Sequence, residues 1–140
     1  MTQVICNSFK VELFKAIHDF TTTTGDVFKI ALYTSAAPLS ASTTTYTSTN
    51  EASGSGYSPG GAALASVTPT LNGTFVIVDF ADVTIPSVVL TYRKAMIYNS
   101  TKSNRAVAVF DFGSDRIISS GNLVIQMPTP DTSTAILRAN

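Results

Sequence analysis

The stretch LTYRKAMIYNSTKSNRAVAVFDFG, residues 90 to 113, decides the fold class of this chain. Residues 90 to 100 alternate between two sets of side chains with a period of two, which is the spacing of side chains along a β-strand. The polar segment KSNR predicts a turn, and residues 106 to 113 predict a second strand. A strand, a polar turn and another strand are typical of antiparallel β-structure.

Comparable signals extend this prediction along the chain. Residues 26 to 35 alternate with the same period, and the set Phe28, Ile30 and Leu32 is fully apolar, so it is expected to face the core. Strands are also predicted in the segments TFVIVDFADVTIP (74 to 86) and GNLVIQMP (121 to 128). About six to eight short strands at roughly ten-residue spacing predict an all-β fold, an antiparallel β-sandwich of the jelly-roll kind.

One α-helix is predicted, over residues 8 to 20, because apolar side chains recur there at a period near 3.6. These side chains are Phe9, Leu13, Phe14, Ile17 and Phe20. The apolar face is expected to pack on the sandwich or to cover an open sheet edge. Residues 1 to 140 are predicted to form one domain, with an N-terminal arm (1 to 7), the helix (8 to 20), the sandwich (26 to 140) and an extended Ser/Thr/Gly-rich loop (36 to 61).

The composition disfavours several classes of partner. Only 13% of residues are charged, the formal net charge is zero, and 36 residues are Ser or Thr. A nucleic-acid-binding protein normally has a basic face, so nucleic acid is not expected as a partner. No apolar run is long enough to span a membrane, and the N-terminus lacks the pattern of a signal peptide, so synthesis in the cytoplasm is expected. The single cysteine, Cys6, excludes an intramolecular disulfide.

The glycine-rich segment NEASGSGYSPGG, residues 50 to 61, resembles a phosphate-binding loop only superficially. Gly60 and Gly61 are followed by two alanines instead of the lysine and hydroxyl residue that a P-loop requires. Pro59 stands where the third glycine of a dinucleotide fingerprint would be. Pro59 followed by Gly60 instead predicts a type II turn, with proline at its second position and glycine at its third.

No catalytic or metal-binding pattern is found, and the chain is not expected to be an enzyme or to carry a cofactor or metal. His18 is the only histidine, and it is expected to flank the packed face of the helix or to cap its end. The carboxylate pairs, Asp79 with Asp82 and Asp111 with Asp115, are interpreted mainly as turn or strand-end residues. A weak metal site or an acid–base pair remains an alternative reading of each pair.

The loop and the N-terminal arm are the predicted contact regions. Both are uncharged for long stretches, and neither has a regular apolar pattern that would pack within the chain's own core, so we expect them to contact other chains. Tyrosine is enriched at protein interfaces, and stacking on a sugar is the alternative for the two loop tyrosines. The candidate interface residues are Tyr46, Asn50, Glu51, Tyr57 and Pro59.

Several segments also resemble a family of small virion proteins of tailed bacteriophages, and the similarity covers nearly the whole chain. Its most specific parts are FKIALYTS, TNEASGSGYSPGG and IYNSTKSNRAV, kept in this order with similar spacing. The resemblance implies a non-enzymatic component of the capsid or the tail.

Within that family, the role expected is a head decoration, or cement, protein on the outer capsid surface. Such proteins sit as trimers, bridge neighbouring major capsid subunits and resist the pressure of the packaged DNA. The resemblance therefore implies two partners, the major capsid protein and copies of the chain itself in a homotrimer. A tail-associated or fibre-base protein, or an adhesin that binds host glycans, is the alternative.

Overall fold

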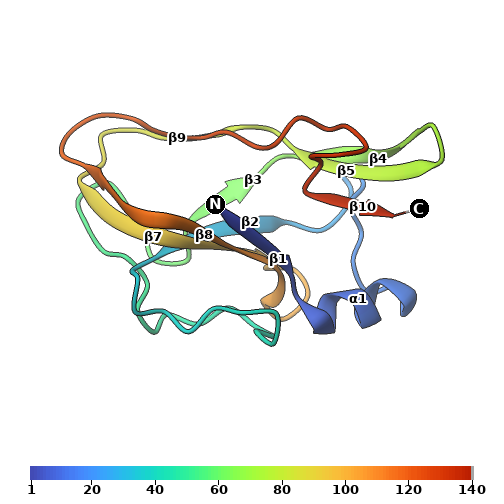
Figure 1. The fold of residues 1–140 in the computed structure, drawn as a ribbon, viewed down its shortest axis with the longest axis horizontal. Coiled ribbons are helices and arrows are strands. Elements are labelled where there is room, and N and C mark those ends of the chain that lie inside the picture. Colours follow the sequence, from blue (N-terminus) through green and yellow to red (C-terminus); the bar gives the residue numbers. More distant parts are fainter. Residues whose placement is uncertain (140) are drawn as a thin grey trace.

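The computed structural model describes residues 1 to 139 as a mostly β fold built from antiparallel sheets, which confirms the predicted all-β class (Figure 1). A single short helix accompanies the strands in this part of the chain. The elements are β1 (Thr2–Ile5), α1 (Asn7–Phe14), β2 (Phe28–Tyr33), β3 (Ala62–Leu64), β4 (Ser66–Asn72), β5 (Phe75–Phe80), β6 (Val83–Ile85), β7 (Leu90–Asn99), β8 (Arg105–Ile118), β9 (Leu123–Ile125) and β10 (Leu137–Ala139).

The largest sheet has five strands in the order β1-β8-β7-β2-β3, and the hairpin of β7 and β8 lies at its centre. The strands predicted from residues 90 to 113 are therefore confirmed. Ser103 and Asn104 both have positive φ, and the Arg105 N–H donates to the Lys102 carbonyl at 3.3 Å. This geometry is that of a type I′ turn, which matches the twist of the two strands it joins.

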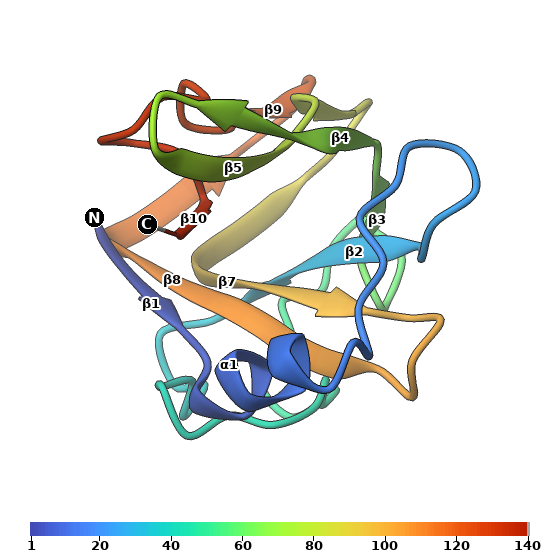
Figure 2. The same cartoon turned by 90° about the vertical axis from the view of Figure 1, so that its right-hand side faces the viewer.

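A second layer lies over one face of the large sheet, as Figures 1 and 2 show. It consists of a three-stranded sheet, β10-β5-β4, and a two-stranded sheet, β6-β9. Three phenylalanines connect the layers: Phe28 of β2 stacks on Phe20 with ring centroids 4.5 Å apart, and Phe80 of β5 lies 5.5 Å from Phe28. Burial of these large rings supplies much of the hydrophobic stabilisation between the layers.

The opposite face of the large sheet is covered by α1 and by the segment between β2 and β3 (Figure 1). Because the central strands are covered on both faces, their burial does not alternate. Ala31 and Tyr33 are as fully buried as Leu32, and residues 95 to 99 of β7 are all buried. Strands covered on both faces read as continuous buried runs.

The helix predicted over residues 8 to 20 ends earlier, at Phe14. Ala16 adopts a left-handed conformation with φ 53°. The Ile17 N–H donates to the Glu12 carbonyl, and the Ala16 N–H donates to the Leu13 carbonyl. These bonds form a Schellman motif, which terminates a helix and reverses the chain.

The N-terminal arm predicted over residues 1 to 7 is not a separate arm in this structure. Thr2–Ile5 pair with β8 as an antiparallel edge strand, and α1 already starts at Asn7. The prediction missed this because β8 is long, extending to Ile118, and its edge needs a partner that local sequence does not reveal. Cys6, between the two elements, is fully buried, and burial raises the pKa of its thiol to about 11.

Candidate functional site

The carboxylate of Glu51 holds the predicted contact loop together. Its Oε1 accepts hydrogen bonds from the Tyr57 hydroxyl and the Gly60 N–H, both at 2.8 Å. Its Oε2 accepts one from the Tyr46 hydroxyl at 2.6 Å. The Gly60 carbonyl accepts a further bond from the Tyr98 hydroxyl of β7 at 2.7 Å. Both oxygens of Glu51 are therefore engaged within the chain.

The Tyr57 hydroxyl completes the edge of β2 beyond the end of β3. It accepts a hydrogen bond from the Leu32 N–H at 2.9 Å, while the Leu32 carbonyl accepts one from the Ala52 N–H. Burial removes water from the phenol, and the neighbouring Glu51 carboxylate repels the phenolate, so the pKa of Tyr57 is raised. The hydroxyl thus takes the place of a main-chain acceptor in the sheet.

These contacts change the list of predicted interface residues. Tyr57 is buried with its hydroxyl facing inward, so this side chain supports the loop and offers no surface to another chain. Tyr46 is half-buried and stacks on Tyr98, with ring centroids 4.8 Å apart, so one face of its ring is already occupied within the chain. Asn50 and Pro59 remain exposed at the surface of the loop.

The glycines of the loop serve turns and close packing. The Gly61 N–H donates to the Ser58 carbonyl, and Gly60 has φ 89°, so the predicted type II turn at Pro59 and Gly60 is confirmed. A Cβ placed on Gly61 would lie 1.9 Å from the Ile30 carbonyl oxygen. Glycine is therefore required where the loop meets the β2 backbone.

His18 lies in a buried polar network between α1 and the β7–β8 turn. Its side chain is 0% exposed, and its Nε2 lies 2.7 Å from Glu12 Oε2. The Asn99 amide nitrogen lies 2.9 Å from His18 Nδ1 and donates to Asp26 at 2.7 Å. On the far side, Arg105 donates to Glu12 Oε1 at 2.6 Å.

The hydrogen bonds around His18 fix its tautomer. Asn99 Oδ1 accepts the N–H groups of Thr101 and Lys102, so its amide nitrogen must be the atom that faces His18. Nδ1 of His18 is then an acceptor, and Nε2 carries the hydrogen that is donated to Glu12. Both ring nitrogens are engaged, so His18 has no free position from which to act as a general base.

Glu12 carries the charge of this network. Burial by itself would raise its pKa, but hydrogen bonds from His18 and Arg105, with the positive charge of Arg105, outweigh burial and hold the pKa of Glu12 below its ordinary value. Sequence reasoning gave no sign that Glu12 is buried. It missed the network because Arg105 is 93 residues away along the chain.

The exposed side of α1 carries three apolar side chains beside the exposed Asn7 and Lys10, which the predicted helix did not anticipate. Phe14 is 96% exposed, and Val11 and Leu13 are also exposed, while Phe9 and Glu12 are the buried side chains of the helix. The predicted stripe shares only Phe9 with the buried side of α1. An almost fully exposed phenylalanine beside two other exposed apolar residues is typical of a contact surface.

Of the four aspartates expected in turns or at strand ends, Asp79 lies within β5, Asp111 and Asp115 lie within β8, and Asp82 lies between β5 and β6. Asp82 accepts the Met127 N–H, and Asp111 accepts the Gly113 N–H at 2.8 Å and an Arg93 hydrogen bond at 3.0 Å. The Gly113 bond and then the Arg93 bond lower the pKa of Asp111. Among residues 1 to 139, no three His, Cys, Asp or Glu side chains gather as a metal-binding group.

Comparisons with known proteins add no further identification, because no family model, no curated protein and no solved structure matches this chain. Within the described residues, no helix has both the length and the apolar character needed to cross a membrane.

Proposed function

We propose that this chain is a structural protein of a tailed-bacteriophage virion, a decoration protein that binds the outer capsid as a trimer and bridges major capsid subunits. The resemblance in FKIALYTS, TNEASGSGYSPGG and IYNSTKSNRAV supports the phage assignment. The layered antiparallel sheets support a compact spacer, and we further propose that these layers are a sandwich of the jelly-roll kind.

The observation that carries the proposal is the exposure of Phe14 on α1, beside the exposed apolar side chains of Val11 and Leu13. A phenylalanine that is 96% exposed contributes nothing to the stability of the free chain. Buried in a partner, it would hide roughly 150–250 Å² of apolar surface, which is the contribution of a central interface residue. We therefore assign α1 as the anchor to a partner protein.

A bridging protein needs a second contact surface, and the chain offers one far from α1. A groove of about 700 Å³ lies between the loop and the outer ends of β7 and β8. Exposed Val89 and Ile117 are among its apolar residues, and Ser55, Thr91 and Ser119 are among its hydroxyl residues. Figure 1 shows α1 near one end of the long axis and these strand ends near the other.

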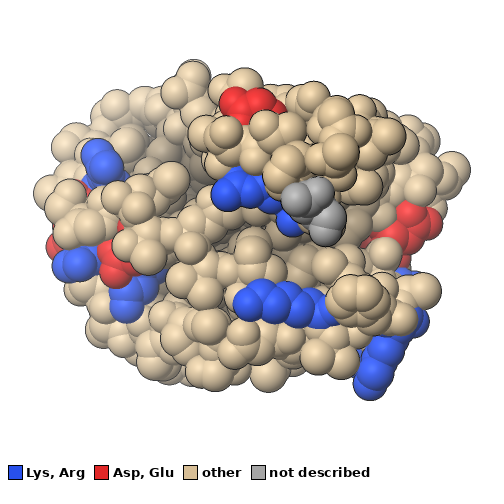
Figure 3. All heavy atoms as spheres, turned by 45° about the vertical axis from the view of Figure 1, so that its right-hand side comes forward, with Lys and Arg blue, Asp and Glu red and all other residues tan. Residues whose placement is uncertain are grey.

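The low charge of the surface supports binding through many weak contacts. The face drawn in Figure 3 is mostly uncharged, with separated Lys, Arg, Asp and Glu side chains. A net charge of zero gives little electrostatic protection against association. In a symmetric assembly, weak contacts are repeated and their effects combine through avidity.

The test is binding to purified expanded capsids that lack tails. Phe14→Ala is expected to reduce binding by about tenfold or more, since it removes the central apolar contact. Leu71→Ala, at a position that is 72% exposed on β4, is the matched control and is expected to bind like the native chain. Because both side chains are exposed, both variants are expected to keep the native melting temperature.

Copy number and position in the particle decide between the possible roles. A decoration protein is expected in hundreds of copies on the shell, visible at local three-fold positions by cryo-electron microscopy. Six or twelve copies that purify with tails would refute the capsid role in favour of a tail component. Binding to cell-wall sugar without binding to capsids would favour the adhesin.

A further inference from the structure

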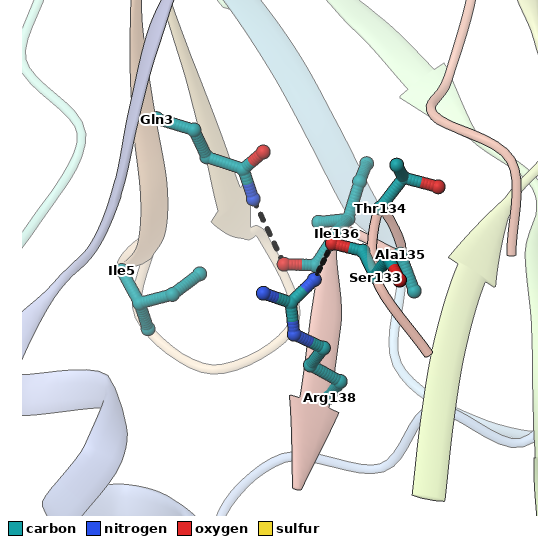
Figure 4. A pocket seen from close by; sticks show the side chains of 7 residues that line it. All are labelled: Gln3, Ile5, Ser133, Thr134, Ala135, Ile136 and Arg138. Carbon is teal, nitrogen blue, oxygen red and sulfur yellow. Dashed lines mark hydrogen bonds between the residues drawn. The ribbon is translucent and has the colours of Figure 1, made fainter. Parts of the chain in front are cut away.

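A groove of about 420 Å³ lies between β1 and the segment that leads into β10. Figure 4 shows Gln3 and Ile5 of β1 on one side and Ser133 to Arg138 on the other. The Gln3 side-chain amide donates across the groove to the Ile136 carbonyl at 2.9 Å, and the Arg138 guanidinium donates to the Ser133 carbonyl. In Figure 2, β1 forms the outer border of the large sheet.

The free edge of β1 presents unpaired main-chain groups. The Cys6 N–H donates to the Val107 carbonyl at 3.0 Å, next to the pairs Ile5 with Ala108 and Val4 with Val109. In an antiparallel ladder, alternate residues point their N–H and C=O groups to the same side. Thr2 and Val4 therefore face β8, and the main-chain groups of Gln3 and Ile5 point outward, where no partner lies among residues 1 to 139.

The edge strand β4 differs from β1 in how it is protected. The edge strand β4 contains Pro69, which lacks an N–H, and its register shifts between Val67 and Thr70. Proline and irregular register are ordinary means of blocking unwanted pairing at an edge. The sequence of β1, TQVI, carries no proline, no charge and no register shift. β1 is thus an edge that remains able to pair.

We propose that β1 receives an extended segment of another protein chain as an added strand, with an acidic side chain of that segment opposite Arg138. The outward N–H and C=O groups of Gln3 and Ile5 match the main chain of a polypeptide. Arg138 is the one charged residue that lines the groove within the described chain, so charge complementarity favours an acidic segment. This inference rests on the edge geometry and does not depend on the proposed virion role.

The probe is a capped heptapeptide, VTVEVTV, titrated into the full-length protein while amide signals are followed by NMR. The Gln3 and Ile5 amides are expected to shift and to exchange about tenfold more slowly with solvent. The amides of Val4 and Cys6, already bonded to β8, are expected to change little. The same peptide with alternate amides N-methylated, and VTVKVTV with lysine in place of glutamate, are the matched control peptides.

Two protein variants sharpen the test. Ile5→Pro removes the outward N–H without touching a bond to β8, and it is expected to abolish peptide binding. Ile5→Ala loses similar side-chain packing but keeps the N–H, so it is expected to bind. Equal binding of the N-methylated peptide, or no response at Gln3 and Ile5, would overturn the proposal. Protection of these amides by protein concentration alone would also overturn it, since the occupant would be a second copy.

Discussion

Replacing Tyr57 by phenylalanine tests whether its hydroxyl completes the edge of β2. The ring and its packing remain, and only the hydroxyl is lost. The buried Leu32 N–H then has no acceptor, and Glu51 Oε1 loses a donor. Because Leu32 is 0% exposed, water cannot replace the lost acceptor without opening the loop.

The expected loss of stability follows from these two bonds. An unsatisfied buried N–H costs about 1–3 kcal/mol, and a hydrogen bond to a carboxylate contributes about 1.5–3 kcal/mol. The two effects share one hydroxyl and are not fully additive, so we expect the free energy of unfolding to fall by about 3 kcal/mol. For a chain of this size, that corresponds to a decrease in melting temperature of about 10 °C.

Urea unfolding followed by circular dichroism measures the change, and Tyr92→Phe is the matched control. Tyr92 is also buried, but its hydroxyl makes no hydrogen bond within the described residues, so its loss is expected to cost less than about 0.5 kcal/mol. Amide exchange at Leu32 is expected to accelerate in Tyr57→Phe only. If both variants unfold at the same urea concentration, the hydroxyl does not have the role assigned to it.

Three further predictions concern the helix and the loop. Glu12→Gln is expected to cost ~2 kcal/mol at pH 7. Because folding lowers the pKa of Glu12, the stability difference between the two proteins is fully present above pH 4.5, the ordinary pKa of a glutamate. It shrinks as the pH falls through the pKa of Glu12 in the folded chain. Urea unfolding at several pH values measures this dependence. Ala16→Gly is expected to stabilise the chain by ~0.5–1 kcal/mol in the same assay, since glycine adopts φ 53° without strain. Gly61→Ala is expected to lower the free energy of unfolding by more than ~3 kcal/mol, and Gly73→Ala by only ~1 kcal/mol. Both glycines have positive φ, but only Gly61 faces a nearby carbonyl. Equal melting temperatures of the two variants would refute this.

The sequence predicts the parts of this fold that depend on neighbouring residues. The period of two in β7 and the positive-φ residues Ser103 and Asn104 belong to one hairpin, so a short window contains all the information needed. The turn at Pro59 and Gly60 is local in the same way. The end of α1 also depends on neighbouring residues, but the left-handed residue there is an alanine. Glycine at that position would have indicated the end of the helix in the sequence, and alanine does not.

The parts that were missed depend on residues far apart in the chain. A carboxylate on a helix is normally hydrated, so nothing in the local sequence marks Glu12 as buried, yet Arg105 and His18 supply its partners in the folded chain. Burying Glu12 together with Phe9 rotates the helix, and that rotation turns Phe14 outward. The exposure of the apolar side chains of α1 thus follows from the contacts that bury Glu12, and no local sequence pattern indicates those contacts.

The same reasoning explains why several loop side chains that were predicted at an interface instead stabilise the loop. A chain with few charges must satisfy its buried backbone with the groups it has, and here the Glu51 carboxylate and the hydroxyls of Tyr57 and Tyr98 do so from inside. Three of the five predicted interface side chains, Tyr46, Glu51 and Tyr57, are consequently hydrogen-bonded within the chain. The exposed apolar side chains of α1 and the outward main-chain groups of β1, which we propose as contact sites, are features that a search for polar surface residues would not select. For a protein of this composition, we therefore expect contact surfaces at unpaired sheet edges and exposed apolar side chains as well as in the hydroxyl-rich loop.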